Sequence, residues 1–148
     1  MNSRFFEIEL SYKQKDLKLK HDKIVRSEDI YTVFLELFDN RLLTIKEECY
    51  VLYINKSNRI TGFYKLSSGG ITGTIVDIRL IMAIALKSLS LGLILAHSHP
   101  SGNLKPSPAD FFATDRLRTA AQLMDIRLID HLIITTNGYY SFSDQGEI

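Results

Sequence analysis

The order of apolar and polar positions along the chain predicts alternating helices and strands. Apolar residues spaced three or four apart indicate helices at 27–38, 78–89 and 108–124. Short apolar or alternating runs indicate strands at 49–54, 59–66, 91–97, 126–135 and 139–142. The polar stretch "NKSN" and the pair Asn137-Gly138 predict two hairpin turns. We therefore expect a mixed α/β fold in which antiparallel hairpins flank a central strand at 91–97.

The first 25 residues have a pattern of their own. Residues 4–25 alternate roughly between apolar and polar positions, which predicts an N-terminal β-hairpin or two edge strands. We divide the chain into this extension, residues 1–26, and one globular domain, residues 27–148. Between Ser11 and Arg26 there are six Lys or Arg residues against two Asp residues. A solvated strand edge protected by lysines explains this excess best, and a small nucleic-acid contact is the sharper alternative.

Composition limits the class of protein. The chain of 148 residues is 45% hydrophobic and 24% charged, as in an ordinary water-soluble domain with a real core. A net charge of +1 gives no general reason to bind nucleic acid or anionic lipid. Cys49 is the only cysteine, which excludes an internal disulfide and suits a reducing compartment. Without a signal-peptide core or a membrane-length apolar run, we expect a cytoplasmic protein.

Candidate chemistry lies where the central strand ends. His97 and His99 are two residues apart, so on a strand both rings face one side while Ser98 faces the other. Pro100 breaks the strand there, and Asp110 lies in the first turn of the helix that follows. Two imidazoles and a carboxylate form a common ligand set for catalytic zinc, with the fourth position open to water. Zinc would lower the pKa of that water to about 7.

Two points stay open at the level of the residues. Ser107 and Asp110 also fit a capping box, a local structure that needs no metal. A water-activating site also needs a base, for which Glu47 and Glu48 are the candidates. Strand alternation sends one of them inward and the other to solvent, and the pattern does not say which.

Glu47 together with "HSHPSGNLKPSPAD" resembles the JAMM motif of the JAB/MPN metalloprotease superfamily, and the RadC-like branch in particular. Further blocks from about Ser27 onward, such as "SSGGITGTIVDIRLIMAIALK" and "MDIRLIDHLIIT", are similar to that branch in the same order. The resemblance implies a cytidine-deaminase-like α/β/α sandwich with a mixed sheet and a Zn²⁺ site. It makes His97, His99 and Asp110 the metal ligands, Ser107 the oxyanion stabiliser and Glu47 the general acid/base. Two departures are Ser98, where the branch usually has Asn, and the absence of the helix-hairpin-helix region of longer members.

These features favour a zinc-dependent hydrolase of amide bonds, a metallopeptidase or isopeptidase acting on a peptide or protein. One alternative is a RadC-like DNA-repair accessory with weak DNA contact, and another is a non-catalytic MPN scaffold. Exposed edge strands make a homodimer plausible. We expect His131 to be a core histidine hydrogen-bonded to backbone rather than a fourth ligand, and Cys49 to be a small core residue.

Overall fold

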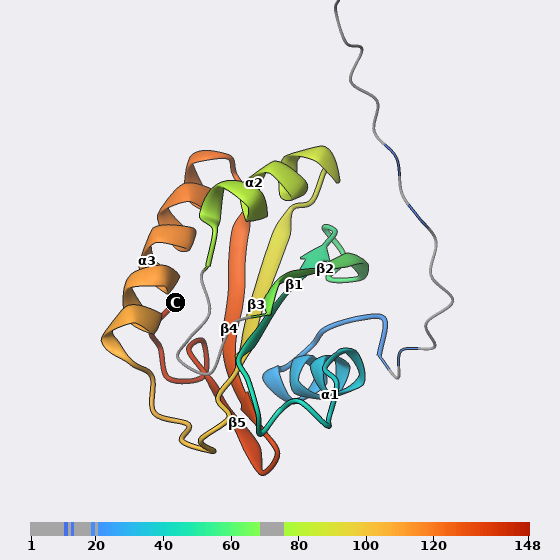
Figure 1. The fold of residues 1–148 in the computed structure, drawn as a ribbon. Helices are drawn as coiled ribbons and strands as arrows, with labels where there is room; N and C mark the ends of the chain where they lie inside the picture. Colours follow the sequence, from blue (N-terminus) through green and yellow to red (C-terminus); the bar gives the residue numbers. More distant parts are fainter. Residues whose placement is uncertain (1–10, 12, 14–18, 20, 69–75) are drawn as a thin grey trace, which may run out of the picture.

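A computed structural model describes residues 11, 13, 19, 21–68 and 76–148 of the chain (Figure 1). The predicted N-terminal hairpin lies largely outside these residues, so it stays a prediction, as does the boundary at residue 26. The described elements follow in the order α1 (Ser27–Leu37), β1 (Glu48–Ile54), β2 (Ile60–Ser68), α2 (Ile78–Lys87), β3 (Gly92–Ser98), α3 (Pro108–Leu123), β4 (Arg127–Thr135) and β5 (Gly138–Ser141).

The five strands form one mixed sheet in the order β2-β1-β3-β4-β5. β1 pairs antiparallel with both β2 and β3, whereas β3 and β4 run parallel because α3 carries the chain back between them. β4 and β5 form the hairpin predicted at Asn137-Gly138. The prediction of a mixed α/β fold with β3 at its centre is therefore confirmed.

Helices cover both faces of the sheet and give the domain three layers (Figure 1). Helix α1 packs on one face, where Phe34 joins Leu52 and Ile94 in a buried cluster. Helices α2 and α3 pack on the other face, where Ile81 and Leu117 join residues of β1 and β3. Strand β3 has no exposed position, since it is covered on both faces and paired on both edges. The likeness to cytidine deaminases stays a prediction.

The chain preceding α1 joins this body through residues 22–24. The backbone N–H of Ile60 donates to the carbonyl of Asp22, and that of Ile24 donates to Asn58. Ile24 is buried among the residues around α1. In the described part of the chain, no helix has the length and apolar run needed to cross a membrane.

Candidate metal centre

The two histidines of the central strand converge as strand alternation predicts. His97 is buried and lies opposite Cys49 of β1 and Ile133 of β4. His99 follows the last residue of β3 but continues its ladder, because its N–H donates to the carbonyl of Ile134 at 3.0 Å. The Nε2 atoms of His97 and His99 lie 2.9 Å apart.

Ser98, between the two histidines, faces the opposite side of the sheet, as predicted. Its hydroxyl oxygen accepts a hydrogen bond from the backbone N–H of Glu48 at 3.0 Å. The hydroxyl of Ser98 therefore lies on the other side of the sheet from the two rings.

The orientation of His99 leaves a lone pair at the point where the rings meet. Its Nδ1 lies 2.7 Å from the carbonyl oxygen of Asn103. A carbonyl only accepts hydrogen bonds, so Nδ1 carries the proton. In the neutral ring, Nε2 is then an unprotonated nitrogen that faces His97 and Asp110.

The carboxylate of Asp110 completes this group. Its Oδ1 lies 3.1 Å from Nε2 of His97, and its Oδ2 lies 3.6 Å from Nε2 of His99. Burial alone would favour the neutral acid, but the contacts with the two rings outweigh it and hold the pKa of Asp110 well below its usual range. The carboxylate is therefore ionised throughout the physiological range.

Asp110 also closes the capping box that the sequence suggested. Its Oδ2 accepts from the backbone N–H of Ser107 at 2.7 Å, and the Ser107 hydroxyl accepts from the N–H of Asp110 at 3.2 Å. The capping and metal-binding interpretations are thus compatible, because one carboxylate oxygen caps α3 while the other points at His97. The cap also fixes the carboxylate before any ligand arrives.

The donor set fits a metal ion. His97, His99 and Asp110 offer ligand atoms that all lie within 4.8 Å of one another. The lone pairs of two unprotonated imidazole nitrogens and an ionised carboxylate repel each other at this range unless a proton or a cation lies between them. A metal cation can take that place, and two nitrogens with one oxygen suit zinc and neighbouring transition metals.

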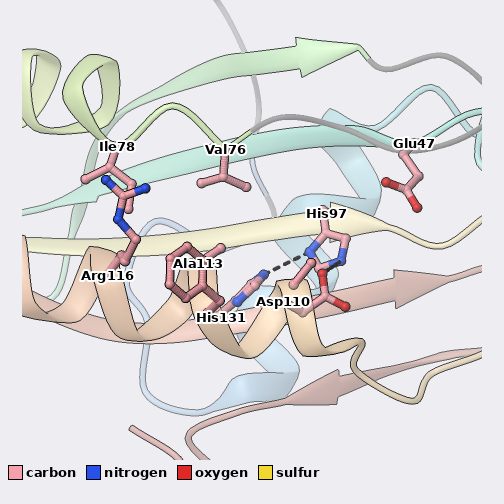
Figure 2. A pocket seen from close by; sticks show the side chains of 10 residues that line it. Glu47, Val76, Ile78, His97, Asp110, Ala113, Arg116 and His131 are labelled. Atoms are coloured by element: carbon pink, nitrogen blue, oxygen red, sulfur yellow. Dashed lines mark hydrogen bonds and ion pairs between the residues drawn. The ribbon is translucent and has the colours of Figure 1, made fainter.

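A cavity of about 240 Å³ opens beside the three ligands, and its walls include His97, Asp110 and Glu47 (Figure 2). The carboxylate of Glu47, which directly precedes β1, points toward the place where His97 and Asp110 meet (Figure 2). The remaining wall is formed by Val76, Ile78, Ala109, Phe112, Ala113, Arg116 and His131. The base candidate and two of the three candidate ligands, His97 and Asp110, therefore line one cavity.

Glu48 lies on the opposite face of the sheet, and here the expectation of a solvent-exposed carboxylate is wrong. Its side chain is only 1% exposed, and its Oε1 lies 2.5 Å from Nζ of Lys65 on β2. The ion pair with Lys65 stabilises the buried charge. The hydrogen bond to Glu48 favours the charged form of Lys65 and outweighs the opposing effect of burial. The pKa of Lys65 is therefore raised.

His131 is a core histidine, as predicted, but its partners are side chains rather than backbone. Its Nε2 lies 2.8 Å from Nδ1 of His97, and its Nδ1 lies 2.6 Å from Oγ1 of Thr114. The ring stacks on Phe142 with the centroids 4.6 Å apart. Burial lowers the pKa of His131 well below its usual value, so the ring is neutral at physiological pH.

Two further predicted residues lie outside the cavity. Ser107 is exposed at the start of α3 and is not among the residues that line the cavity, while Cys49 is buried in the core as expected.

The sequence analysis did not identify Thr114 and Arg116, which lie on α3 one and nearly two turns beyond Asp110. The spacing of four residues between Asp110 and Thr114 places both on one side of the helix, and it was the available signal.

The sequence of this chain is similar to those of a known protein family. A sequence model described as the RadC-like JAB domain matches residues 24–147. A UPF0758 protein of Flavobacterium johnsoniae is 45% identical over 130 residues, which cover 88% of this chain and 55% of that protein. A UPF0758 protein of Porphyromonas gingivalis is 47% identical over 102 residues, covering 68% of this chain and 45% of that protein.

A shorter relative is the UPF0758 protein YfjY of Escherichia coli, 43% identical over 101 residues that cover 68% of this chain and 63% of YfjY. The chain thus spans about half the length of the Flavobacterium and Porphyromonas relatives that it matches. The names of these relatives describe no substrate or reaction.

Proposed function

Because this chain belongs to the family of RadC-like JAB domains, a branch of the JAB/MPN superfamily, we propose that it is a zinc-dependent hydrolase of amide bonds. One observation carries this proposal. The imidazole nitrogens of His97 and His99 and the carboxylate of Asp110 converge on one point, beside a cavity that Glu47 also faces. A purely structural cluster has no need for such a set beside a cavity.

His97, His99 and Asp110 would hold the ion through Nε2, Nε2 and a carboxylate oxygen. Bound zinc would supply Lewis acidity for the substrate carbonyl and a water whose pKa is lowered to about 7. Glu47 would accept the proton of the attacking water and pass it to the leaving amine. Its place across the cavity from His97, rather than among the ligands, suits a group that moves protons.

Ser107 would stabilise the oxyanion that develops as the carbonyl is attacked. Its hydroxyl oxygen already accepts a hydrogen bond from the N–H of Asp110, so its own proton remains available to donate. A lost oxyanion donor typically reduces the rate by about 10²–10³-fold. The exposed position of Ser107 at the N-terminus of α3, hydrogen-bonded to Asp110, supports this role.

The walls of the cavity support a peptide or protein as substrate. Val76, Ile78 and Phe112 provide apolar surface beside the ligands, and Arg116 adds a positive charge at the same wall. A side chain next to the scissile amide could lie on this surface while the carbonyl faces the ligands. Whether the bond belongs to a peptide or to an isopeptide linkage is a matter for a substrate screen.

The experiment that tests this proposal is a cleavage screen on zinc-loaded protein. Libraries of peptides and of lysine-linked isopeptides would be incubated with the wild type and with Glu47→Gln, and products identified by mass spectrometry. We expect cleavage by the wild type, nearly none by the variant, and loss of activity when zinc is removed by a chelator. Cleavage that is equal in both proteins, or that persists without metal, would overturn the proposal.

A further inference from the structure

A chain of three short hydrogen bonds joins His97 to the backbone of Asp110. Nδ1 of His97 lies 2.8 Å from Nε2 of His131, and Nδ1 of His131 lies 2.6 Å from Oγ1 of Thr114. The Thr114 hydroxyl in turn donates to the carbonyl oxygen of Asp110 at 2.6 Å. The chain thus begins at one proposed metal ligand on β3, passes through β4, and ends on α3 at another (Figure 2 shows its first bond).

The donor and the acceptor of each hydrogen bond follow from the group at the end of the chain, the carbonyl of Asp110. The carbonyl of Asp110 only accepts, so the single hydroxyl proton of Thr114 points to it. The Thr114 oxygen must then accept from His131, which places a proton on Nδ1 of that ring. In the neutral ring Nε2 is an acceptor, so Nδ1 of His97 must carry the proton of their shared bond.

This order of donors and acceptors determines the protonation of Nε2 of His97, the atom that faces the other candidate ligands. A neutral imidazole with its proton on Nδ1 has an unprotonated Nε2, and this atom lies 3.1 Å from Oδ1 of Asp110. The opposite direction would bring the Thr114 oxygen and the Asp110 carbonyl to 2.6 Å without a proton between them, which is repulsive. The network therefore permits the metal-binding tautomer of His97 and disfavours the other.

Packing holds the middle of the chain in place. His131 is 1% exposed, and its ring lies nearly parallel to Phe142, with an interplanar angle of 7°. Thr114 is buried on the side of α3 that faces the sheet. Burial of both groups and the stacking of His131 on Phe142 favour this order of donors and acceptors before any metal binds.

We infer that His131 and Thr114 are positioning residues that set the tautomer and the ring orientation of His97 for metal binding. This inference rests on the metal site of the proposed function. Outer groups of this kind fix ligand rings in metal centres, and their loss typically weakens metal affinity by about 10–100-fold. An unusual feature here is that the outer group is a neutral histidine, whose direction is imposed by a threonine one turn after a ligand.

Paired variants test the inference through zinc affinity. Thr114→Val removes the hydroxyl with little change of shape, and Thr114→Ser restores it. His131→Leu removes both ring nitrogens, whereas the amide of His131→Gln can still accept from His97 and donate to Thr114. Zinc dissociation constants would be measured on each protein by competition with a chelator, and thermal unfolding of the metal-free forms would show that each is folded.

We expect Thr114→Val and His131→Leu to bind zinc about 10–100-fold more weakly, with Thr114→Ser and His131→Gln closer to the wild type. Long-range ¹H–¹⁵N NMR spectra of the zinc-loaded wild type supply a second readout that needs no variant. They should show His131 with its proton on Nδ1 and an unprotonated Nε2.

Two results would overturn the inference alone: wild-type zinc affinity in both Thr114→Val and His131→Leu, or a proton on Nε2 of His131 in the zinc-loaded protein. If a valine or leucine variant does not fold, the NMR measurement and the Thr114→Ser variant still decide. A wild-type chain that takes up no zinc would instead overturn the proposed function, and this inference with it.

Discussion

Glu47 and Glu48 are adjacent in the sequence, yet their carboxylates lie on opposite faces of the sheet. Glu47 faces the cavity that His97 and Asp110 line, on the side covered by α2 and α3. Glu48 is buried on the other side, where it pairs with Lys65. The two carboxylates therefore lie in separate environments, and substitutions at each should change different properties.

Replacing Glu47 should slow turnover strongly without loss of the metal. Gln has nearly the same shape as Glu, but its amide cannot accept a proton usefully near neutral pH. Glu47→Gln should fold normally and bind zinc as the wild type does, while its rate of hydrolysis falls by about 10²–10⁴-fold. Steady-state kinetics on a substrate from the cleavage screen, with zinc quantified in the same samples, checks this.

Glu48→Gln is the matched control, since it makes the same chemical change one residue away. Its activity per folded molecule should stay within a few-fold of the wild type. If Glu48→Gln were the inactive variant, the assignment of the base would be reversed. Loss of zinc in Glu47→Gln would instead make Glu47 a ligand.

The Glu48–Lys65 pair should matter for stability. Removing one member of a buried ion pair typically costs about 3–5 kcal/mol, and the partial exposure of Lys65 places this pair at or below the low end. Lys65→Met should therefore lower the free energy of unfolding more than Glu48→Gln, because it leaves a buried carboxylate. The double variant should be more stable than Lys65→Met in denaturant titrations, and additive losses would contradict a direct pairing.

The ligand group could be predicted from the sequence because local rules place it. Strand alternation puts His97 and His99 on one side, and a capping box orients Asp110 at the start of α3. The helices and strands followed in the same way from their apolar spacing. At the start of α1, Ser27 suggests a helix cap from the sequence, but it is the first residue of the helix, and the Asp29 carboxylate accepts from the N–H groups of Val25 and Arg26 instead.

The surroundings of the ligands could not be predicted, because they depend on contacts between distant segments. The burial of Glu48 follows from Lys65 of the neighbouring strand, 17 positions later. The contact between His131 and Thr114 arises only where α3 crosses β4. The apolar and polar pattern of one segment predicts neither which distant side chain a residue contacts nor how deeply that residue is buried.

Zinc binding should weaken as the pH is lowered, because protons compete for His99. Burial opposes protonation, but Asp110 and the Asn103 carbonyl outweigh it and raise the pKa of His99. Competition should therefore begin above about 6.5, the ordinary pKa of histidine. Chelator competition from about pH 5.5 to 8 checks this, and an affinity that is constant over that range would contradict it.

The stability of the metal-free protein should depend on pH in the opposite direction to its zinc affinity. Protonated His99 pairs with Asp110, so its raised pKa contributes stability that is fully present below about pH 6.5 and is lost as the pH rises through the raised value. The difference in unfolding temperature between the metal-free wild type and His99→Gln should therefore shrink as the pH rises. A difference that grows with pH would show that the pair does not form.

DNA binding should be weak and non-specific. The lysines of the N-terminal region are Lys13, Lys15, Lys18, Lys20 and Lys23, and we expect them to carry the contacts with phosphates. Binding carried by such contacts should fade as salt rises from about 50 to 200 mM. Fluorescence anisotropy with labelled duplexes checks this, and tight binding that survives the higher salt would favour the DNA-processing alternative.

The central claim is that His97, His99 and Asp110 hold one catalytic zinc ion, and metal quantification tests it most directly. Wild type, Asp110→Ala and Ser107→Ala would be purified without added metal and equilibrated with zinc. After removal of the unbound zinc, the metal content of each protein would be measured by elemental mass spectrometry. Ser107→Ala is the matched control, because it weakens the same helix cap but keeps all three ligands. We predict close to one zinc per chain in the wild type and in Ser107→Ala, and little in Asp110→Ala. Full zinc occupancy in Asp110→Ala would contradict the account and leave Asp110 as a helix cap alone.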